Sequence, residues 1–271
     1  MINIGVFKKR LDRDFKKLKV VSFDVFDTLL IRLLPSECVS KIAAEKLSRL
    51  IFHETSIVLA ADEILHSRIN FRLHRNTTGS RNEEWTLSQW LTALAVKQGI
   101  DPELITRLGR QAELESEFLN LRLDHYAIEA LNEAKERELM VIATSDMWLD
   151  QDWLEDLLID FQLFFDKVFT SGSLGVSKRK RTIFRVIEKQ LALYPDTFLH
   201  VGNKFRSDFL QPRVAGWNSL LTYENHPLMR MNLPTKFRKG PFRPKPFEKI
   251  FHILGVDPPP ENIEHLLLFG V

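Results

Sequence analysis

From residue 125 to residue 223, segments with the pattern of a helix alternate with segments with the pattern of a buried strand. The helical segments repeat apolar residues every three or four positions, and the strand segments are short apolar runs. Alternation at this interval implies right-handed crossovers between parallel strands, so we predict a doubly wound parallel α/β sheet. The expected strands are 139–146, 167–171, 197–203 and 217–223, and the expected helices are 125–138, 148–161, 181–193 and 207–216.

One more apolar run, from Val20 to Phe23, precedes Asp24 near the start of the chain. It has the character of a strand inside a parallel sheet, where an aspartate is almost never buried without a partner. Ligands of such sheets bind beyond the carboxyl ends of the strands. We therefore expect the ends of four segments to meet in one crevice. The polar residues at these ends are Asp24, Ser145, Lys178, Asn203 and Asp208.

Residues 35–120 contain no strand pattern, and apolar residues recur there at helical spacing. Pro35, Thr86 and Asp101 stand where helices should start, and Gly99 stands where one should stop. We predict an all-helical block made of four helices. Their expected spans are 35–52, 56–73, 86–99 and 101–121.

The composition excludes several classes of protein. With 271 residues, 44% of them hydrophobic and 27% charged, the chain can bury a core of one elaborated domain or two. The formal charge of +2 is too balanced to argue for nucleic-acid binding. A single cysteine excludes an internal disulfide, and the chain start lacks the apolar stretch of a signal peptide. Since no run approaches the roughly 18 apolar residues of a membrane span, we expect a cytoplasmic protein.

The two ends of the chain differ from its middle. Residues 1–17 are basic and have a helical pattern, which fits a solvated helix or one that contacts an acidic lipid or partner surface. Residues 224–271 form a proline-rich, basic extension with interleaved phenylalanines. This extension could lie on its own domain or bind a protein partner.

Three motifs connect the chain to a known family. "FDVFDTLL", "ATSDMWL" and "VGNKFRSD" occur in this order, each at the end of an expected strand, and a loop lysine, Lys178, lies between the last two. This order resembles the haloacid dehalogenase (HAD) superfamily over about residues 18–223. The wording resembles a subgroup associated with glycosyltransferases and with capsule or polysaccharide biosynthesis. The resemblance implies a Rossmann-like core (1–34 and 121–223), a helical cap (35–120) and an added extension (224–271).

The resemblance also implies roles for individual residues. Asp24 would be the nucleophile that forms an aspartyl phosphate, which water then hydrolyses. Lys178 and a magnesium ion would offset the negative charge of the substrate. Ser145 would hold a phosphoryl oxygen, and Thr28 would orient the loop. The expected Mg²⁺ ligands are Asp24, the backbone carbonyl of Phe26, Asn203 and Asp208.

Two positions depart from the phosphatase pattern. Most HAD phosphatases carry a second aspartate two residues after the nucleophile, to protonate the leaving oxygen, whereas this chain has Phe26. Asp27 is one residue further on and is an uncertain substitute, because adjacent residues of an extended chain point opposite ways. Asn203 replaces the usual acidic ligand of the last motif. These departures predict weak metal binding.

Each site residue also has a purely structural interpretation. Asp24 could cap the following turn, and Ser145 or Asp146 could cap a helix that begins near Trp148, which we favour for Asp146. Any basic residue of 178–181 could be a solvated surface charge, although the position after "SGSLGV" favours Lys178. The histidines are scattered and none pairs at a metal-ligand interval, so none is assigned a role.

Three functions remain open from the sequence. The favoured one is a metal-dependent phosphatase that hydrolyses a small phosphomonoester such as a sugar phosphate, with the cap closing over it. The alternative is a catalytically weak or inactive HAD module that acts as a binding or scaffolding partner in polysaccharide assembly. Dehalogenase chemistry is the third, because true dehalogenases carry an aromatic residue at the Phe26 position and an Asn near the Asn203 position.

Overall fold

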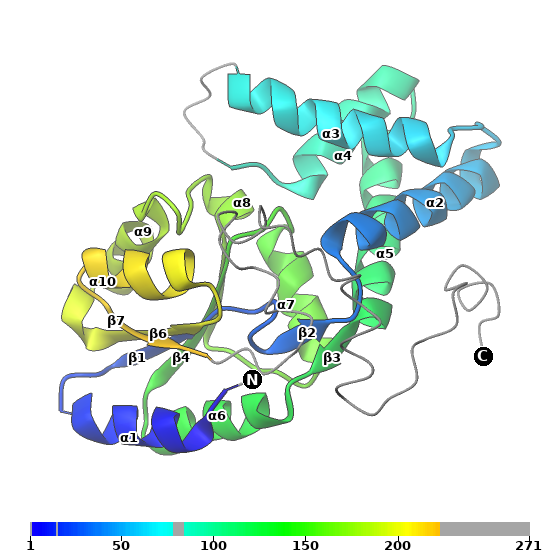
Figure 1. Cartoon of the computed structure of the whole chain (residues 1–271). Helices are drawn as coiled ribbons and strands as arrows, with labels where there is room; N and C mark the ends of the chain where they lie inside the picture. Colours follow the sequence, from blue (N-terminus) through cyan, green and yellow to red (C-terminus); the bar gives the residue numbers. More distant parts are fainter. Residues whose placement is uncertain (1, 15, 78–83, 223–271) are drawn as a thin grey trace, which may run out of the picture. The chain divides into compact units, whose positions relative to one another are not determined.

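The protein folds around a five-stranded parallel sheet (Figure 1). The computed structural model describes residues 2–14, 16–77 and 84–222. The strands lie in the order β5-β4-β1-β6-β7, and β1 in the middle pairs in parallel with β4 and β6. The strands are β1 (Val20–Phe23), β4 (Met140–Ser145), β5 (Lys167–Thr170), β6 (Phe198–Gly202) and β7 (Asn218–Leu221). The parallel sheet predicted from the alternating pattern is confirmed.

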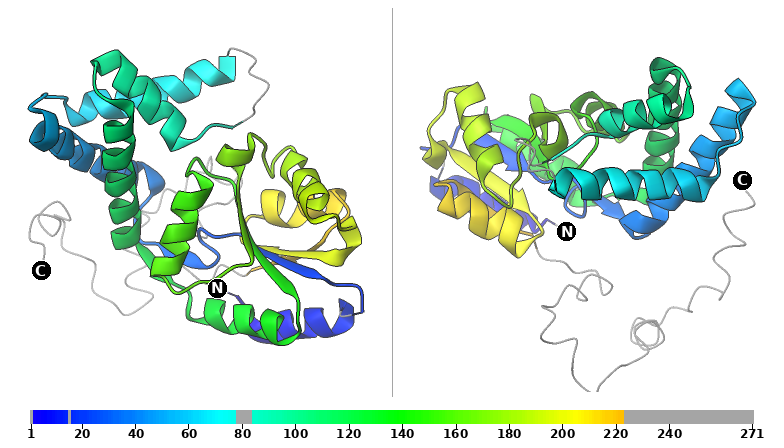
Figure 2. Two further views of the ribbon diagram at one scale, coloured as in Figure 1. Left: turned by 180° about the vertical axis from the view of Figure 1, so that it is seen from behind. Right: turned by 90° about the horizontal axis from the view of Figure 1, so that it is seen from above.

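Helices cover both faces of this sheet, because alternate residues of each strand point to opposite sides. Val21 and Phe23 of β1 belong to the apolar cluster that includes α1 and α6, while Val20 belongs to the cluster that includes α9. In Figures 1 and 2, α1 and α6 lie side by side along one face. The sheet is therefore doubly wound. The flanking helices are α1 (Ile4–Asp14), α6 (His125–Glu136), α7 (Gln151–Asp160), α9 (Thr182–Leu191) and α10 (Gln211–Val214).

Four helices make up the described part of the block between the first and second strands of the sheet, as predicted. Thr86 accepts the backbone N–H of Gln89 and forms a capping box, and Asp101 accepts the N–H groups of Glu103 and Leu104. The helices are α2 (Ser36–Thr55), α3 (Ala61–Thr77), α4 (Leu87–Gln98) and α5 (Pro102–Asn120). The predicted starts at Thr86 and Asp101 are therefore confirmed by their hydrogen bonds.

The ends of two of these helices depend on left-handed backbone. Gly99 ends α4 at φ 66°, as expected for a glycine at this position. Ser56 ends α2 at φ 60°, and its N–H donates to the carbonyl of Phe52. The helix predicted to begin at residue 56 begins only at Ala61. The prediction was wrong for residues 56–60 because they connect two helices and do not start the second.

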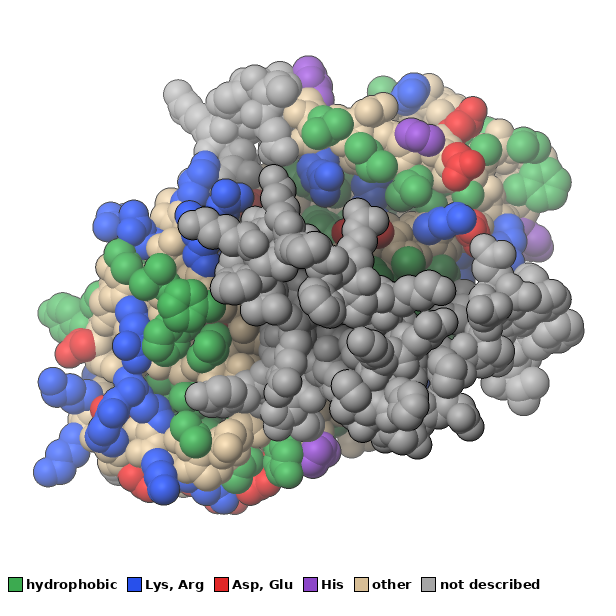
Figure 3. All heavy atoms as spheres, in the orientation of Figure 1, with side chains coloured by type: hydrophobic (Ala, Val, Ile, Leu, Met, Phe, Trp, Pro, Cys, Tyr) green, Lys and Arg blue, Asp and Glu red, His purple; other side chains and the backbone are tan. Residues whose placement is uncertain are grey.

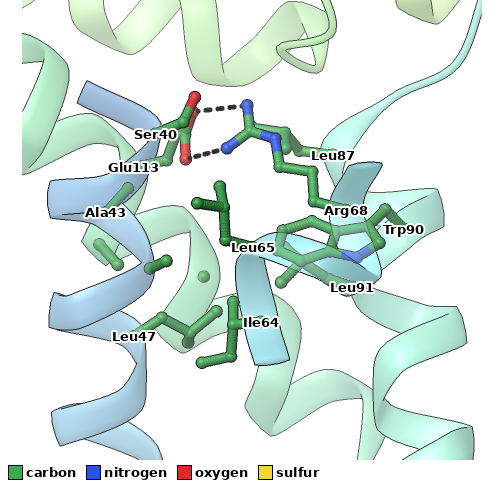
Figure 4. A pocket seen from close by; sticks show the side chains of 13 residues that line it. Ser40, Ala43, Leu47, Ile64, Leu65, Arg68, Leu87, Trp90, Leu91 and Glu113 are labelled. Carbon is green, nitrogen blue, oxygen red and sulfur yellow. Dashed lines mark hydrogen bonds and ion pairs between the residues drawn. The ribbon is translucent and has the colours of Figure 1, made fainter. Parts of the chain in front are cut away.

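The block contains a buried ion pair among its apolar residues (Figure 4). The guanidinium of Arg68 on α3 donates two hydrogen bonds of 3.1 Å to the carboxylate of Glu113 on α5. Only 7% of Arg68 and 4% of Glu113 is exposed. Since a buried charge is tolerated only with a partner, this pair ties α3 to α5.

A short antiparallel pair of strands, which the sequence did not predict, lies at both connections of the helical block. It consists of β2 (Leu30–Arg32) and β3 (Leu121–Leu123). The pairing continues on both sides, because the N–H of Leu33 donates to the carbonyl of Asn120 and that of Asp124 to the carbonyl of Leu29. The two chain segments that enter and leave the block are thus held together.

The segment after β6 also differs from the prediction. In place of one helix over 207–216, a π-helix, η2 (Phe205–Leu210), runs into the short helix α10. Pro212 lies at the start of α10, where its missing N–H matters least. Two other short helical elements are α8 (Ser171–Leu174) and the 3₁₀ turn η1 (Pro195–Thr197).

The helix predicted near the chain start is confirmed as α1, whose Phe7 and Leu11 are fully buried. The predictions for 224–271 concern residues outside those that the structure describes. Among the helices of the described residues, none combines the length and the apolar character required to cross a bilayer.

Removing the Thr86 cap should destabilise the protein. Thr86→Ala leaves the N–H of Gln89, in the first turn of α4, without its side-chain acceptor and should lower the free energy of unfolding by about 1 kcal/mol, measured by urea denaturation. Thr92→Ala is the matched control, because the Thr92 hydroxyl bonds the Ser88 carbonyl within the same helix. Alanine favours that helical position, so equal losses in the two variants would contradict the assigned cap.

Candidate active site

The polar residues predicted to share one crevice stand at the carboxyl ends of adjacent strands. Asp24 follows β1 directly, Ser145 is the last residue of β4, and Asn203 follows β6. The N–H of Asp24 donates to the carbonyl of Val201 on β6 at 2.8 Å, which continues the ladder past the end of β1. The position of Asp24 is therefore fixed by the sheet itself.

A buried lysine joins two of the predicted carboxylates. The Nζ of Lys178 lies 2.5 Å from Oδ1 of Asp24 and 2.9 Å from Oδ1 of Asp208. Only 1% of Lys178, 5% of Asp24 and 0% of Asp208 is exposed. Residues separated by more than 150 positions along the chain thus form one ion triad, named here the Asp24–Lys178–Asp208 triad.

Burial and the neighbouring charges shift the pKa values of Lys178 and Asp208 in opposite directions. Burial disfavours the ammonium of Lys178, but the carboxylates of Asp208, Asp24 and Asp146 together raise its pKa above the ordinary value. Burial likewise disfavours the carboxylate of Asp208, yet the Lys178 ammonium and the His200 ring lower its pKa well below the ordinary range. As a result, Lys178 and Asp208 are both charged at neutral pH.

The backbone of the Lys178 loop is held by Asp146. The N–H of Lys178 donates to Oδ1 of Asp146 at 2.8 Å. The prediction that Asp146 caps a helix near Trp148 is wrong, since α7 starts at Gln151 and Asp150 occupies its N-cap position. Asp146 instead accepts a hydrogen bond from a loop 32 residues away in sequence. Burial, its largest influence, raises the pKa of Asp146.

The basic run that contains Lys178 divides into one buried and three exposed residues. Lys178 is buried, whereas Arg179, Lys180 and Arg181 are exposed. Lys and Arg side chains also gather on the face around α8 and α9 (Figure 3). The burial of Lys178 agrees with the prediction, made from its position after "SGSLGV", that it is the residue of this run that belongs to the site.

In the turn after Asp24, the side chain of Thr28 contacts Asp24, whereas those of Phe26 and Asp27 contact Arg32. The hydroxyl of Thr28 donates to Oδ2 of Asp24 at 3.3 Å, so the structure brings these two predicted site residues together. Asp27 has a left-handed backbone (φ 62°), and its Oδ1 accepts the N–H of Arg32 at 3.3 Å. The guanidinium of Arg32 lies over the ring of buried Phe26, with its Cζ 3.9 Å from the ring centroid. Asp27 is thus engaged with β2.

The turn after β6 holds Asp208 close to the strand. Oδ2 of Asp208 accepts the N–H of Lys204 at 2.9 Å, and the N–H of Asp208 donates to the Lys204 carbonyl. A Cβ atom on Gly202 would lie 2.5 Å from Cβ of Asp208. Glycine is therefore required at position 202, because any side chain there would displace Asp208.

Three residues that the sequence left unassigned lie behind the triad. They are Ser22, Thr144 and His200, each with 0% exposure. Oγ of Ser22 lies 2.9 Å from Nδ1 of His200, and Nε2 of His200 lies 3.5 Å from Oδ1 of Asp208. Burial, the largest influence, lowers the pKa of His200 and keeps its ring neutral. The sequence signal that could have found all three is a polar residue within a mostly apolar strand.

The oxygen atoms at this site are of the kind that Mg²⁺ prefers. Asp24 and Asp208 supply carboxylates, Asn203 an amide oxygen and Phe26 a backbone carbonyl, all hard ligands. Within residues 2–14, 16–77 and 84–222, no three acidic, histidine or cysteine side chains form a ready metal cluster. The donor set thus fits Mg²⁺ in chemistry but brings only two carboxylates, and both already pair with Lys178.

Comparisons with known proteins give a consistent picture. The family model described as haloacid dehalogenase-like hydrolase matches residues 18–210. The Haloacid dehalogenase-like hydrolase domain-containing protein 3 of Xenopus laevis is 27% identical over 224 residues, which cover 80% of this chain and 89% of that protein. The Glyceraldehyde 3-phosphate phosphatase of Methanothermobacter thermautotrophicus is 31% identical over 71 residues, covering 26% of this chain and 31% of that protein.

Among solved structures, a 2-haloacid dehalogenase from Pseudomonas syringae pv. Tomato DC3000 superposes with a TM-score of 0.51. The two chains are 17% identical, and the match covers 75% of this chain and 86% of that one. At this identity the likeness concerns the fold alone.

Replacing the buried lysine should change how stability depends on pH. Lys178→Met leaves Asp24 and Asp208 buried without a counter-charge, so the free energy of unfolding at pH 7 should fall by about 3–5 kcal/mol. In the variant the buried carboxyl groups lack the ammonium and are protonated at low pH. As the pH rises they must ionise without a counter-charge, so the loss of unfolding free energy relative to the parent protein grows. In the parent protein the stability due to Asp208 is present above an unfolded pKa of about 3.9 and is lost below it. The deficit should therefore shrink markedly toward pH 4.

Urea denaturation of both proteins at several pH values measures this deficit. Lys189→Met, at an exposed position of α9, is the matched control and should change stability by less than about 0.5 kcal/mol. A Lys178→Met deficit that is the same at pH 4 and pH 7 would mean that Lys178 contributes packing and no charge compensation.

Proposed function

The chain belongs to the haloacid dehalogenase-like hydrolase family, and from this premise we propose that it is a phosphatase that hydrolyses a small phosphomonoester through an aspartyl phosphate on Asp24. The proposal rests on the Asp24–Lys178–Asp208 triad. A carboxylate is fixed at a strand end next to a buried ammonium, and attack by an anion on a phosphate requires such a positive charge.

The proposed reaction has two steps. An oxygen of Asp24 attacks phosphorus, the bond from phosphorus to the substrate oxygen breaks, and the leaving oxygen departs as an anion that takes its proton from solvent water. Water then attacks the aspartyl phosphate, which releases inorganic phosphate and restores the carboxylate. Lys178 offsets the negative charge that develops, Ser145 holds a phosphoryl oxygen, and Thr28 keeps Asp24 oriented through its hydroxyl.

The lack of a side chain that can protonate the leaving oxygen determines which substrates are preferred. Phe26 occupies the position of the usual proton donor, and Asp27 pairs with Arg32. The chain therefore favours phosphomonoesters whose leaving group departs without protonation, such as aryl phosphates or sugar 1-phosphates, over simple alkyl phosphates.

Magnesium would be held by Asp24, Asp208, Asn203 and the Phe26 carbonyl. It would supply positive charge to the phosphoryl oxygens. The carboxylate oxygens of Asp24 and Asp208 already accept hydrogen bonds from Lys178, Thr28 and the Lys204 backbone. This arrangement supports a weak metal site and gives the alternative, a weakly catalytic module, its main support.

The helical block serves as a cap in this proposal. Residues 35–120 would select the substrate, and 1–34 with 121–223 would form the catalytic core. The strands β2 and β3 lie at the two connections, so the hinge would lie near Leu33 and Arg122. Residues 224–271 would be the extension through which a protein partner binds.

The three motifs point to a role in capsule or polysaccharide biosynthesis. "FDVFDTLL", "ATSDMWL" and "VGNKFRSD" resemble the subgroup found with glycosyltransferases, so the proposed substrate is a sugar phosphate. The scaffolding alternative would act in the same setting without turnover. Phosphate release from a panel of sugar, aryl and alkyl phosphates, with and without Mg²⁺, separates the two.

Asp24→Asn should abolish phosphate release while the fold remains intact. The change is nearly isosteric and removes only the nucleophilic charge, so turnover should fall on the order of a thousandfold or more. Asp27→Asn is the matched control in the same turn, because Asp27 faces Arg32, and it should keep most of its turnover. An Asp24→Asn protein that turns over normally would rule out Asp24 as the nucleophile.

Asn203→Asp should tighten Mg²⁺ binding. The substitution adds the carboxylate that the site lacks, so the affinity measured by titration calorimetry should rise roughly tenfold, about 1.4 kcal/mol. Asn132→Asp, on the exposed side of α6, adds the same charge away from the site and should leave the affinity unchanged. Equal affinity in all three proteins, or no binding by any, would favour the weakly catalytic module.

A further inference from the structure

A chain of polar side chains crosses the middle of the sheet beneath the triad. Ser22 of β1 pairs in register with His200 of β6, and Thr144 comes from β4 on the other side of β1. Oγ of Ser22 lies 2.9 Å from Oγ1 of Thr144 and 2.9 Å from Nδ1 of His200. All three residues are fully buried, in strands whose other side chains are mostly apolar.

The chain of contacts ends on the triad. Nε2 of His200 lies 3.5 Å from Oδ1 of Asp208, the same oxygen that accepts Nζ of Lys178. Each link joins a different pair of elements: β4 to β1, β1 to β6, and β6 to η2. A buried polar group is costly unless it is hydrogen-bonded, so packing alone does not explain polar residues at these positions.

The contacts select one form of the neutral ring. With the proton on Nδ1, the lone pair of Nε2 would face the carboxylate of Asp208, which is repulsive. With the proton on Nε2, the positive end of the N–H dipole faces Oδ1 of Asp208 at 3.5 Å, an attractive contact that is not aligned as a hydrogen bond, while Nδ1 accepts the Ser22 hydroxyl. Ser22 then accepts from Thr144, so the hydroxyl protons of Thr144 and Ser22 both have acceptors, and the Nε2 proton faces the Asp208 carboxylate across 3.5 Å.

We propose that His200 is a positioning residue, held by Ser22 and Thr144 with its proton on Nε2, that fixes Asp208 and through it the ammonium of Lys178 against Asp24. Its effect on turnover rests on the proposed function, whereas its protonation pattern does not. Without the ring N–H, Oδ1 of Asp208 loses an attractive contact at 3.5 Å, so the carboxylate is less firmly placed against Lys178.

The aromatic surroundings of His200 allow a test that separates position from packing. The ring lies 6.0 Å from Phe184 and 6.5 Å from Trp217 between ring centroids, both in edge contacts. Phenylalanine at position 200 would keep such contacts and lose both nitrogens. A residue needed only for packing would tolerate this change.

The first measurement is independent of activity. Nitrogen-15 NMR of the histidine side chains of the full chain, with His200 assigned by its loss in His200→Phe, reports which ring nitrogen carries the proton. At neutral pH we expect a protonated Nε2 and an unprotonated Nδ1, and a shift toward the other tautomer in Ser22→Ala. A proton on Nδ1 in the parent protein, or no response to Ser22→Ala, would overturn the inference.

The second measurement is kinetic. His200→Phe and Ser22→Ala should each lower kcat, the former by about 10- to 100-fold, the loss typical of a second-layer partner, with KM little changed. In the double variant the Ser22→Ala effect should largely disappear, because Ser22 acts through the ring. Phe184→Leu, which alters packing against the same ring, is the control and should keep kcat within a few-fold. Additive losses, or an unchanged kcat in His200→Phe, would refute the positioning role.

The two measurements fail in distinguishable ways. If the parent protein releases no phosphate from any substrate, the proposed function fails while the NMR result still decides the protonation of His200. Should His200→Phe not fold, His200→Gln supplies the NMR assignment, and Ser22→Ala carries both the tautomer and the kcat comparison.

Discussion

The contact of one buried ammonium with two buried carboxylates is the interaction on which the rest of the site depends. Lys178 is 1% exposed and would be strongly destabilising without Asp24 and Asp208. The three residues come from the end of β1, the loop after α8 and the helix η2. The charges can be buried only when the whole core is assembled, so the fold and the site form together.

The order of the strands explains why these residues meet. The chain passes from β1 through the helical block to β4 and β5 on one side, then crosses to β6 and β7 on the other. This crossing places the carboxyl ends of β4 and β6 on either side of β1, the usual ligand position of such sheets. Asp24 thus receives neighbours from both directions, and the loop after β5 brings Lys178.

Local signals made much of this architecture predictable, and long-range contacts account for the rest. Thr86, Asp101 and Gly99 act on neighbouring residues, so their roles as helix ends followed from the sequence. Asp146 had the same local signal, but its partner is the distant Lys178 loop. The strands β2 and β3 have three residues each, too few for a periodic pattern. For His200, a place in the expected strand 197–203 could not indicate which atoms it contacts.

The two departures from the phosphatase pattern differ in how they are built into the structure. Asn203 follows β6 directly, and aspartate has nearly the shape of asparagine, so an acid there changes the charge of the site with little rearrangement. Phe26 supports the Arg32 guanidinium, which also pairs with Glu117 of α5 at 3.4 Å. An acid at position 26 would therefore remove the ring under Arg32, the residue that links the turn after β1 to α5 through Glu117. Such a cation–π contact contributes about 0.5–2 kcal/mol, so the missing proton donor is coupled to the attachment of the helical block.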